Sequence, residues 1–181
     1  MAEQAKTDAA FLMYGIPFPS EKDAILALLA GVALEETAAG VAIGKWAAIT
    51  KDPELRGGLR IISEREAYHG RVFKQRLNEL GGAKTKPQRD PSIKAINDSL
   101  PDPTLSDQEK LDRLHAYSPD PEALLKPLKD FAHTIKDDPE TREALLLYYQ
   151  DEISSGTWLC GMRGTLMSRK APTPAHRTLA A

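Results

Sequence analysis

Four stretches of the chain place apolar residues at every third or fourth position, which is the period of an amphipathic helix. The first stretch begins after Ser20 and ends near Thr50. Its apolar face consists of Ile25, Leu28, Leu29, Val32, Ala39, Ile43, Trp46 and Ala47. One charged residue, Glu36, interrupts this face. The pattern therefore predicts a long helix that buries a carboxylate among apolar side chains.

A second helix is predicted to begin directly after the first. Asp52 can accept hydrogen bonds from free backbone N–H groups, Pro53 suits the first helical turn, and the helix dipole favours Glu54. The apolar face that follows is formed by Leu59, Ile62, Phe73, Leu77 and Leu80. Glu66 and His69 lie in the middle of this face, and their spacing puts both on one side of the helix.

The middle of the chain has a different character. Residues 82–105 contain four prolines among charged and small polar residues, and they predict a crossover linker with one short helix. Residues 106–117 and 121–136 predict a third helix. The Ser-Pro-Asp-Pro sequence at 118–121 breaks it, because proline removes a helical hydrogen bond.

Two segments of the chain are related in sequence. Residues 52–73 and 138–159 align at an offset of 86 positions. The residues of the first copy that recur unchanged are Asp52, Pro53, Glu54, Arg56, Leu59, Glu66 and Gly70. The second copy keeps its glutamate as Glu152 but has Ser155 where His69 would recur. Such a repeat predicts an architecture of two related helical hairpins.

These patterns divide the chain into three regions. Residues 20–168 are predicted to form the helical domain. A fourth helix is predicted to begin at Asp138-Pro139-Glu140, and its apolar period is lost near Ser168. Residues 1–19 form an extension, and its apolar part is predicted to dock on the helices or on a second subunit in a homodimer. Residues 169–181 contain two further prolines and are predicted to be a disordered tail.

Counting along the helices places the buried carboxylates at one level. Glu36 and Glu66 each lie 15 residues from the turn near Lys51, which is roughly 22 Å along an antiparallel hairpin. Glu122 and Glu152 have the same spacing from the second turn. A pseudo-two-fold packing of the hairpins would bring all four carboxylates and His69 together. Two alternatives stay open: Glu35 could replace Glu36, and Glu122 could simply be a helix-start residue.

Several buried carboxylates require compensation, because each resists leaving water and they repel one another. The apolar faces offer one marginal cation, Arg76, which lies more than two turns from Glu66 and could cover at most one carboxylate. A bound metal ion is the simpler solution. Carboxylate oxygens combined with an imidazole suit iron or manganese.

With these residues the sequence resembles the ferritin-like superfamily, in particular the rubrerythrin-like di-iron carboxylate proteins. The resemblance spans residues 20–168 and is strongest over 62–70. By position, the family's ligand pattern is matched by Glu36, Glu66, His69, Glu122 and Glu152. It implies an all-α, ferritin-like four-helix bundle made of two antiparallel hairpins and a long crossover. It also implies oxygen or peroxide chemistry at two irons, although Ser155 departs from the pattern and leaves one iron without its imidazole.

Composition limits the remaining choices. The 181 residues, 41% apolar and 28% charged, suit one soluble domain. A net charge of -2 without any basic run disfavours nucleic acid as a partner. The first residues lack the basic start and uninterrupted apolar stretch that are typical of a signal peptide, and no run approaches the roughly 18 apolar residues of a membrane span. We therefore expect a cytoplasmic protein without membrane contact. The single cysteine, Cys160, excludes an internal disulfide.

The sequence thus favours a metal-binding protein with a carboxylate and histidine site for iron, with manganese as the alternative. The resemblance extends this to an oxidoreductase that uses dioxygen or peroxide. An electron donor would then be an external protein, because one cysteine cannot form a cysteine-based electron-transfer module. The alternative is a non-catalytic helical bundle with a degenerate metal site, acting as a structural or interaction protein.

Overall fold

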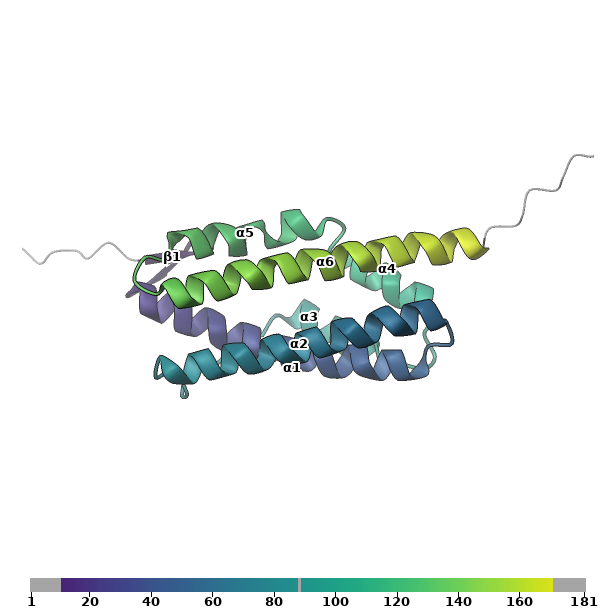
Figure 1. Ribbon diagram of the computed structural model, residues 1–181, viewed down its shortest axis with the longest axis horizontal. Helices are drawn as coiled ribbons and strands as arrows, with labels where there is room; N and C mark the ends of the chain where they lie inside the picture. Colours follow the sequence, from purple (N-terminus) through teal and green to yellow (C-terminus); the bar gives the residue numbers. More distant parts are fainter. Residues whose placement is uncertain (1–10, 88, 171–181) are drawn as a thin grey trace, which may run out of the picture.

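The computed structural model describes residues 11–87 and 89–170. The described part is helical apart from one small sheet, which confirms the predicted all-helical class (Figure 1). Its elements in chain order are β1 Phe11–Met13, β2 Ile16–Phe18, α1 Glu21–Ile49, α2 Pro53–Glu79, α3 Pro91–Ser99, α4 Asp107–Tyr117, α5 Pro121–Thr134 and α6 Pro139–Lys170. Residues 1–10 of the predicted extension and 171–181 of the predicted tail lie outside the described residues.

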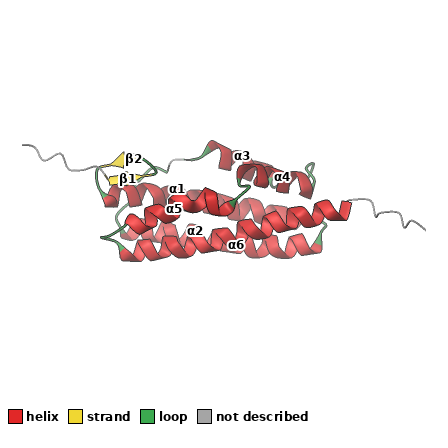
Figure 2. Cartoon of the chain, turned by 90° about the horizontal axis from the view of Figure 1, so that it is seen from above, coloured by secondary structure: helices red, strands yellow, loops and turns green. Residues whose placement is uncertain are grey.

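The long helices run along one axis of the molecule. Helices α1 and α2 form one antiparallel hairpin, and α5 and α6 form another that points the opposite way (Figure 1). Helices α4 and α5 follow one another along α6, separated by the predicted break. The β-hairpin and the end of α6 lie at opposite ends of the molecule (Figure 2).

Small residues let α1 and α2 approach closely at the level of the buried carboxylates. A Cβ atom on Gly40 would lie 3.0 Å from the backbone nitrogen of Ala67, and one on Gly70 would lie 3.0 Å from that of Thr37. The Ser63 hydroxyl donates a hydrogen bond of 2.8 Å to the Gly40 carbonyl. Any larger side chain at either glycine would separate the helices, so these contacts set the distance between Glu36 on α1 and the side chains of Glu66 and His69 on α2.

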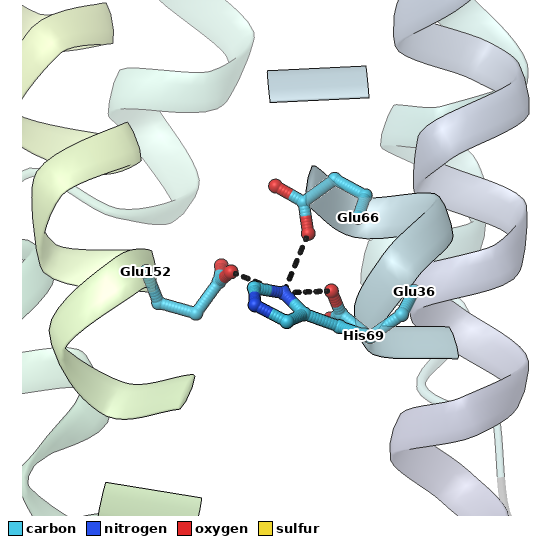
Figure 3. A group of neighbouring side chains, drawn as sticks. All are labelled: Glu36, Glu66, His69 and Glu152. Carbon is cyan, nitrogen blue, oxygen red and sulfur yellow. Dashed lines mark ion pairs between the residues drawn. The ribbon is translucent and has the colours of Figure 1, made fainter. Parts of the chain in front are cut away.

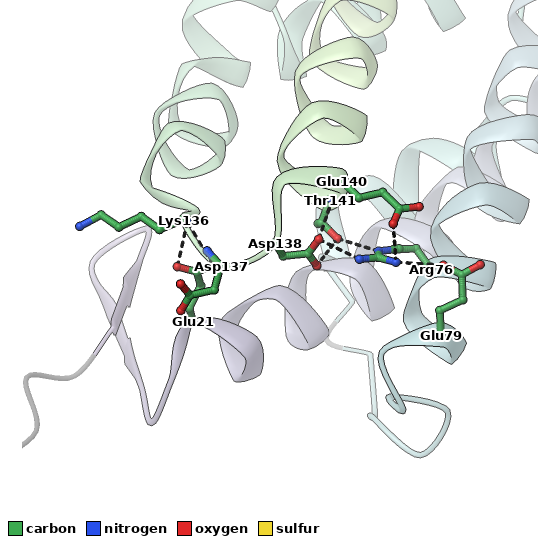
Figure 4. Close-up of polar contacts among 8 residues, drawn as sticks. All are labelled: Glu21, Arg76, Glu79, Lys136, Asp137, Asp138, Glu140 and Thr141. Carbon is green, nitrogen blue, oxygen red and sulfur yellow. Dashed lines mark hydrogen bonds and ion pairs between the residues drawn. The ribbon is translucent and has the colours of Figure 1, made fainter.

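The start of α6 is fixed by polar contacts at one end of the molecule (Figure 4). Asp138 accepts hydrogen bonds from the backbone N–H of Thr141 at 3.0 Å and from the guanidinium of Arg76 at 2.8 Å. Glu21, in the first turn of α1, accepts from the backbone N–H of Lys136 at 3.0 Å and of Asp137 at 2.9 Å. These bonds tie the α5–α6 turn to both α1 and α2, and they fix the height of α6 against its neighbours.

Two apolar clusters lie on either side of a polar layer. One contains Phe73 and Leu145 toward the α5–α6 turn, and the other contains Trp46 and Leu59 toward the α1–α2 turn. Trp46 is fully buried, and its ring nitrogen donates to Asp107 at 2.7 Å. The carboxylates of the predicted site lie between these clusters, where water cannot easily solvate them.

The β-hairpin was not predicted from the sequence. Tyr14 and Gly15 turn the chain with φ values of 54° and 77°, and Phe11 meets the ring of Phe131 on α5 edge to face at 6.0 Å. Leu12 remains 60% exposed on the outer face. The described part of the N-terminal extension therefore contacts the helices of its own chain.

By length and composition alone, helix α1 is apolar enough to cross a membrane, although no membrane span was predicted from the sequence. Core helices of globular proteins pass the same test. In this chain α1 packs along α2 and contributes side chains to both apolar clusters.

Candidate metal centre

Four side chains from three helices converge in the polar layer (Figure 3). Glu36 comes from α1, Glu66 and His69 from α2, and Glu152 from α6. One ligand atom of each lies within 4.8 Å of the others. Glu36, Glu66 and His69 are at most 7% exposed, and the side chain of Glu152 is 19% exposed. The structure thus brings together four of the five residues that the sequence predicted as ligands, in a group that could hold a metal ion.

The imidazole of His69 faces three carboxylates. Its Nδ1 atom lies 3.6 Å from Glu36 Oε2, 3.8 Å from Glu66 Oε2 and 3.5 Å from Glu152 Oε1. His69 Nδ1, Glu36 Oε2 and Glu152 Oε1 are buried and have no hydrogen-bond partner. Each unpaired buried polar atom costs about 1–3 kcal/mol. A cation between these atoms would satisfy all of them at once.

Two further residues orient the ligands. Asp151 Oδ2 lies 3.1 Å from His69 Nε2, and the Tyr148 hydroxyl donates a hydrogen bond of 2.7 Å to Glu36 Oε1. If Nε2 carries the proton toward Asp151, the lone pair of Nδ1 is free to bind a metal. The ring of Tyr148 also packs edge to face on His69 at 5.0 Å. These contacts therefore fix the direction of the imidazole ring, with Nε2 toward Asp151 and Nδ1 toward the three carboxylates.

Burial and mutual repulsion change the proton affinities of the group. Burial raises the pKa of Glu66 to about 8, and neighbouring Glu36 acts in the same direction. Burial also raises the pKa of Glu152 to about 7. For His69 burial lowers the pKa, but the surrounding carboxylates outweigh it and raise the pKa to about 12. Without a metal the group therefore retains protons, which take the place of the positive charge that a bound cation would supply.

Glu122 does not join the group. It is exposed in the first turn of α5, and its backbone N–H donates to the capping residue Asp120 at 3.1 Å. The break before α5 starts a new helix, so the 15-residue spacing from the turn does not determine which side of the helix Glu122 occupies. These contacts fit a helix-start role for Glu122, which is one of the two interpretations of the sequence.

Of the two alternatives on α1, Glu36 and not Glu35 lies beside His69. Glu36 faces His69, whereas Glu35 Oε1 accepts from the guanidinium of Arg89 in the linker at 3.2 Å. The other oxygen of Glu35 is buried without a partner. Glu35 is thus a further buried carboxylate, and it lies outside the group around His69.

The guanidinium of Arg65 lies beside Ser155, the position where the repeat would place a second histidine. Arg65 donates to the Ser155 hydroxyl at 2.7 Å and lies 3.5 Å from Asp151 Oδ1. Arg65 and Asp151 occupy equivalent positions in the two copies, as do His69 and Ser155. The contact between Asp151 and His69 therefore recurs as the contact between Arg65 and Ser155. Neither Arg65 nor Asp151 was predicted from the sequence, although the alignment at an offset of 86 positions places them at equivalent positions.

Comparisons of the chain with protein-family models, curated proteins and solved structures find no match. Inferences about function consequently rest on the geometry of the residues themselves. The unpaired atoms of Glu36, His69 and Glu152 are the firmest part of that geometry.

Proposed function

We propose that the protein binds one iron or manganese ion through Glu36, Glu66, His69 and Glu152. The observation that carries this proposal is the pair of unpaired atoms His69 Nδ1 and Glu36 Oε2, in side chains more than nine-tenths buried that face one another at 3.6 Å. Three carboxylates and one imidazole are a donor set typical of iron and manganese sites. A divalent ion would offset most of the negative charge that the three carboxylates carry when ionised.

The number of ions follows from the second copy. Ser155 offers a hydroxyl, which is a poor ligand for iron, and that hydroxyl already accepts a hydrogen bond from Arg65. The guanidinium brings a permanent positive charge to this side of the group and repels a second cation. We therefore favour one ion per chain over the two that the di-iron resemblance implies.

The arrangement supports a place for this chain among ferritin-like proteins of the rubrerythrin-like type. In this proposal α1, α2, α6 and the broken pair α4 and α5 act as the four helices of the bundle. A bound iron would supply electron exchange with dioxygen or peroxide. The chain's own contributions are the charge of the carboxylates, the imidazole tautomer held by Asp151 and the orientation of Glu36 by Tyr148.

A non-catalytic protein with a degenerate metal site is the second candidate. The contact of Arg65 with Ser155 favours it, since this contact removes a ligand that a two-iron reaction centre would need. Both candidates require the same four metal ligands. They differ in whether the loaded protein consumes dioxygen or peroxide.

Metal analysis tests the proposal directly. Protein purified without chelators and loaded anaerobically with Fe(II) or Mn(II) is expected to hold about one ion per chain, and His69→Ala and Glu66→Ala to hold almost none. His133→Ala is the matched control, because His133 is exposed on α5 and lies outside the group. Less than about 0.2 ion per chain in the unmutated protein would contradict a metal-binding function.

A further inference from the structure

A cavity of about 240 Å³ lies beside the candidate metal centre and is lined by residues of all six described helices. Glu36, Glu66 and Glu152 form one part of its lining. Each helix also contributes at least one apolar side chain, and these include Ile43, Ile62, Ile96, Leu114, Leu125 and Leu159. Protein cores rarely leave a space larger than a water molecule. This cavity is much larger and can hold an organic molecule.

The break between α4 and α5 forms the solvent side of this space. Ser118 and Pro121, at the two ends of the break, both line the cavity. Pro121 packs so closely on α6 that a Cβ atom on Gly156 would lie 2.6 Å from its Cγ. Leu124, about one turn further along α5, also lines the cavity and is 43% exposed. A ligand can therefore enter from the surface beside α5.

Little of the polar surface in this lining is accessible. Four polar atoms of the lining residues are buried with almost no accessible surface: Glu35 Oε2, Glu36 Oε2, Asn97 Nδ2 and Glu152 Oε1. Two hydroxyl groups of the lining residues are already engaged, since Tyr148 donates to Glu36 and Ser155 accepts from Arg65. The wall that a ligand would touch is therefore almost entirely apolar. Such a wall offers few hydrogen bonds, and burying a polar group without one costs free energy.

We propose that this cavity binds a small uncharged hydrocarbon, such as an alkylbenzene or an aliphatic molecule of similar size. An apolar cavity of roughly 150 Å³ accommodates benzene, so this one has room for roughly eight to ten carbon atoms. Water gains few hydrogen bonds from such a wall, so a hydrocarbon displaces it at little cost. The inference goes beyond the proposed function, because it concerns an organic ligand and not the metal ion. Binding of the hydrocarbon can be measured with or without the metal, so the two ideas fail separately.

The test compares three ligands of similar shape and increasing polarity. The full chain, metal-free and also loaded with Mn(II), is titrated calorimetrically with ethylbenzene, 4-ethylphenol and 4-ethylbenzoate. Ethylbenzene is expected to bind at least about tenfold more tightly than the phenol, because the cavity leaves the hydroxyl without a partner. The benzoate is expected not to bind the metal-free protein, since burial of its charge costs far more.

Variants of the cavity wall provide the second arm. Leu124→Trp fills the exposed side and is expected to weaken ethylbenzene binding by at least about tenfold. Because Leu124 is partly exposed, this variant is expected to fold. Ile96→Thr puts a hydroxyl into the wall and should reduce the preference for ethylbenzene over the phenol. Leu147→Trp is the matched control, because Leu147 is exposed on α6 and does not line the cavity.

Four outcomes decide the inference. Absence of ethylbenzene binding in the unmutated protein overturns it. Equal affinity for ethylbenzene and 4-ethylphenol overturns the assignment to hydrocarbons. Equal ethylbenzene binding by Leu124→Trp and Leu147→Trp places the ligand outside this cavity and overturns the site. Ethylbenzene binding by a protein that takes up no metal contradicts the proposed function and leaves the cavity assignment standing.

Discussion

Helices α2 and α6 are alike where they build the scaffold and differ where they meet. Both begin with Asp-Pro-Glu, and Leu59 and the equivalent Leu145 are both fully buried. Gly70 and Gly156 each allow a neighbouring element to approach within contact distance. The two helices differ at His69 and Ser155 and at the positions that contact them. Scaffold positions and ligand positions in this repeat have thus followed different constraints.

The two inter-helix contacts show what this difference does. In one, Asp151 of α6 supports the imidazole of His69 on α2. In the other, Arg65 of α2 binds the hydroxyl of Ser155 on α6. One side of the group therefore supplies an imidazole that could bind a metal, with a negative partner, and the other supplies a fixed positive charge. The repeat predicts where the chemistry lies, but it does not make that chemistry symmetric.

The largest expected effect on metal affinity comes from a variant that makes the contact between Asp151 and His69 resemble the contact between Arg65 and Ser155. Asp151→Arg places a guanidinium beside His69, so it removes the support for the imidazole and repels the ion. We expect metal affinity, measured by competition with a chelator, to fall by more than about 100-fold. Asp151→Asn keeps the size of the side chain and should lose about 10- to 100-fold. Equal affinity in Asp151→Arg and the unmutated protein would show that this contact does not support the site.

The converse exchange should create a second site. In the double variant Arg65→Asp/Ser155→His, the second contact acquires the residues of the first. We expect metal uptake to rise from about one ion per chain toward two, because an imidazole replaces a hydroxyl and a repelling charge disappears. Ser155→His alone retains Arg65 and should stay near one ion. A double variant with unchanged metal uptake would mean that another feature limits the site to one ion, such as the position of Glu122 outside the group.

The two copies also differ in how deeply the ion pair at the start of each helix is buried. Arg76 holds Asp138 with its side chain 17% exposed, whereas Arg169 holds Asp52 with its side chain 48% exposed. Arg76→Ala should lower the free energy of unfolding by about 2 kcal/mol, since Asp138 and Thr141 lose a charged partner in a mostly buried setting. Arg169→Ala should cost about 0.5 kcal/mol, the usual value for an exposed pair. Urea unfolding of both variants measures the difference, and equal costs would contradict the role of burial.

The sequence predicted the long helices and the ligand level because both depend on local rules. Asp-Pro-Glu fixes a helix start, and counting from a turn fixes height, so Glu36, Glu66, His69 and Glu152 were placed together. Height alone does not fix direction. For Glu122 the new helix start at Pro121 reset the phase, and the residue came to face solvent.

Features that depend on contacts between distant segments could not be predicted in this way. Arg65 and Asp151 lie off the apolar faces, and only the packing of α2 against α6 gives them a role. The cavity likewise depends on how the break between α4 and α5 meets α6. The turn at Tyr14 and Gly15 was not predicted, because tyrosine rarely adopts a positive φ.

The equivalent glutamates of the two copies should respond differently to pH in the metal-free protein. Folding raises the pKa of Glu66 from 4.5 to about 8 and that of Glu152 from 4.5 to about 7, and burial is the main cause for both. The folded state therefore keeps protons that the unfolded state has released, so stability falls as pH rises from about 4.5 to about 8. His69, with its pKa raised from 6.5 to about 12, acts in the same direction above pH 6.5.

We expect the melting temperature of chelator-treated protein to fall over this range, by on the order of 5 °C. Glu66→Gln should flatten the curve more than Glu152→Gln, because Glu66 is the more deeply buried of the pair. Metal-loaded protein should show the opposite slope, since the ligands must lose protons to bind the ion. A metal-free protein that becomes more stable toward pH 8 would mean that the group is already neutralised without a metal, and the charge deficit on which the site is argued would disappear.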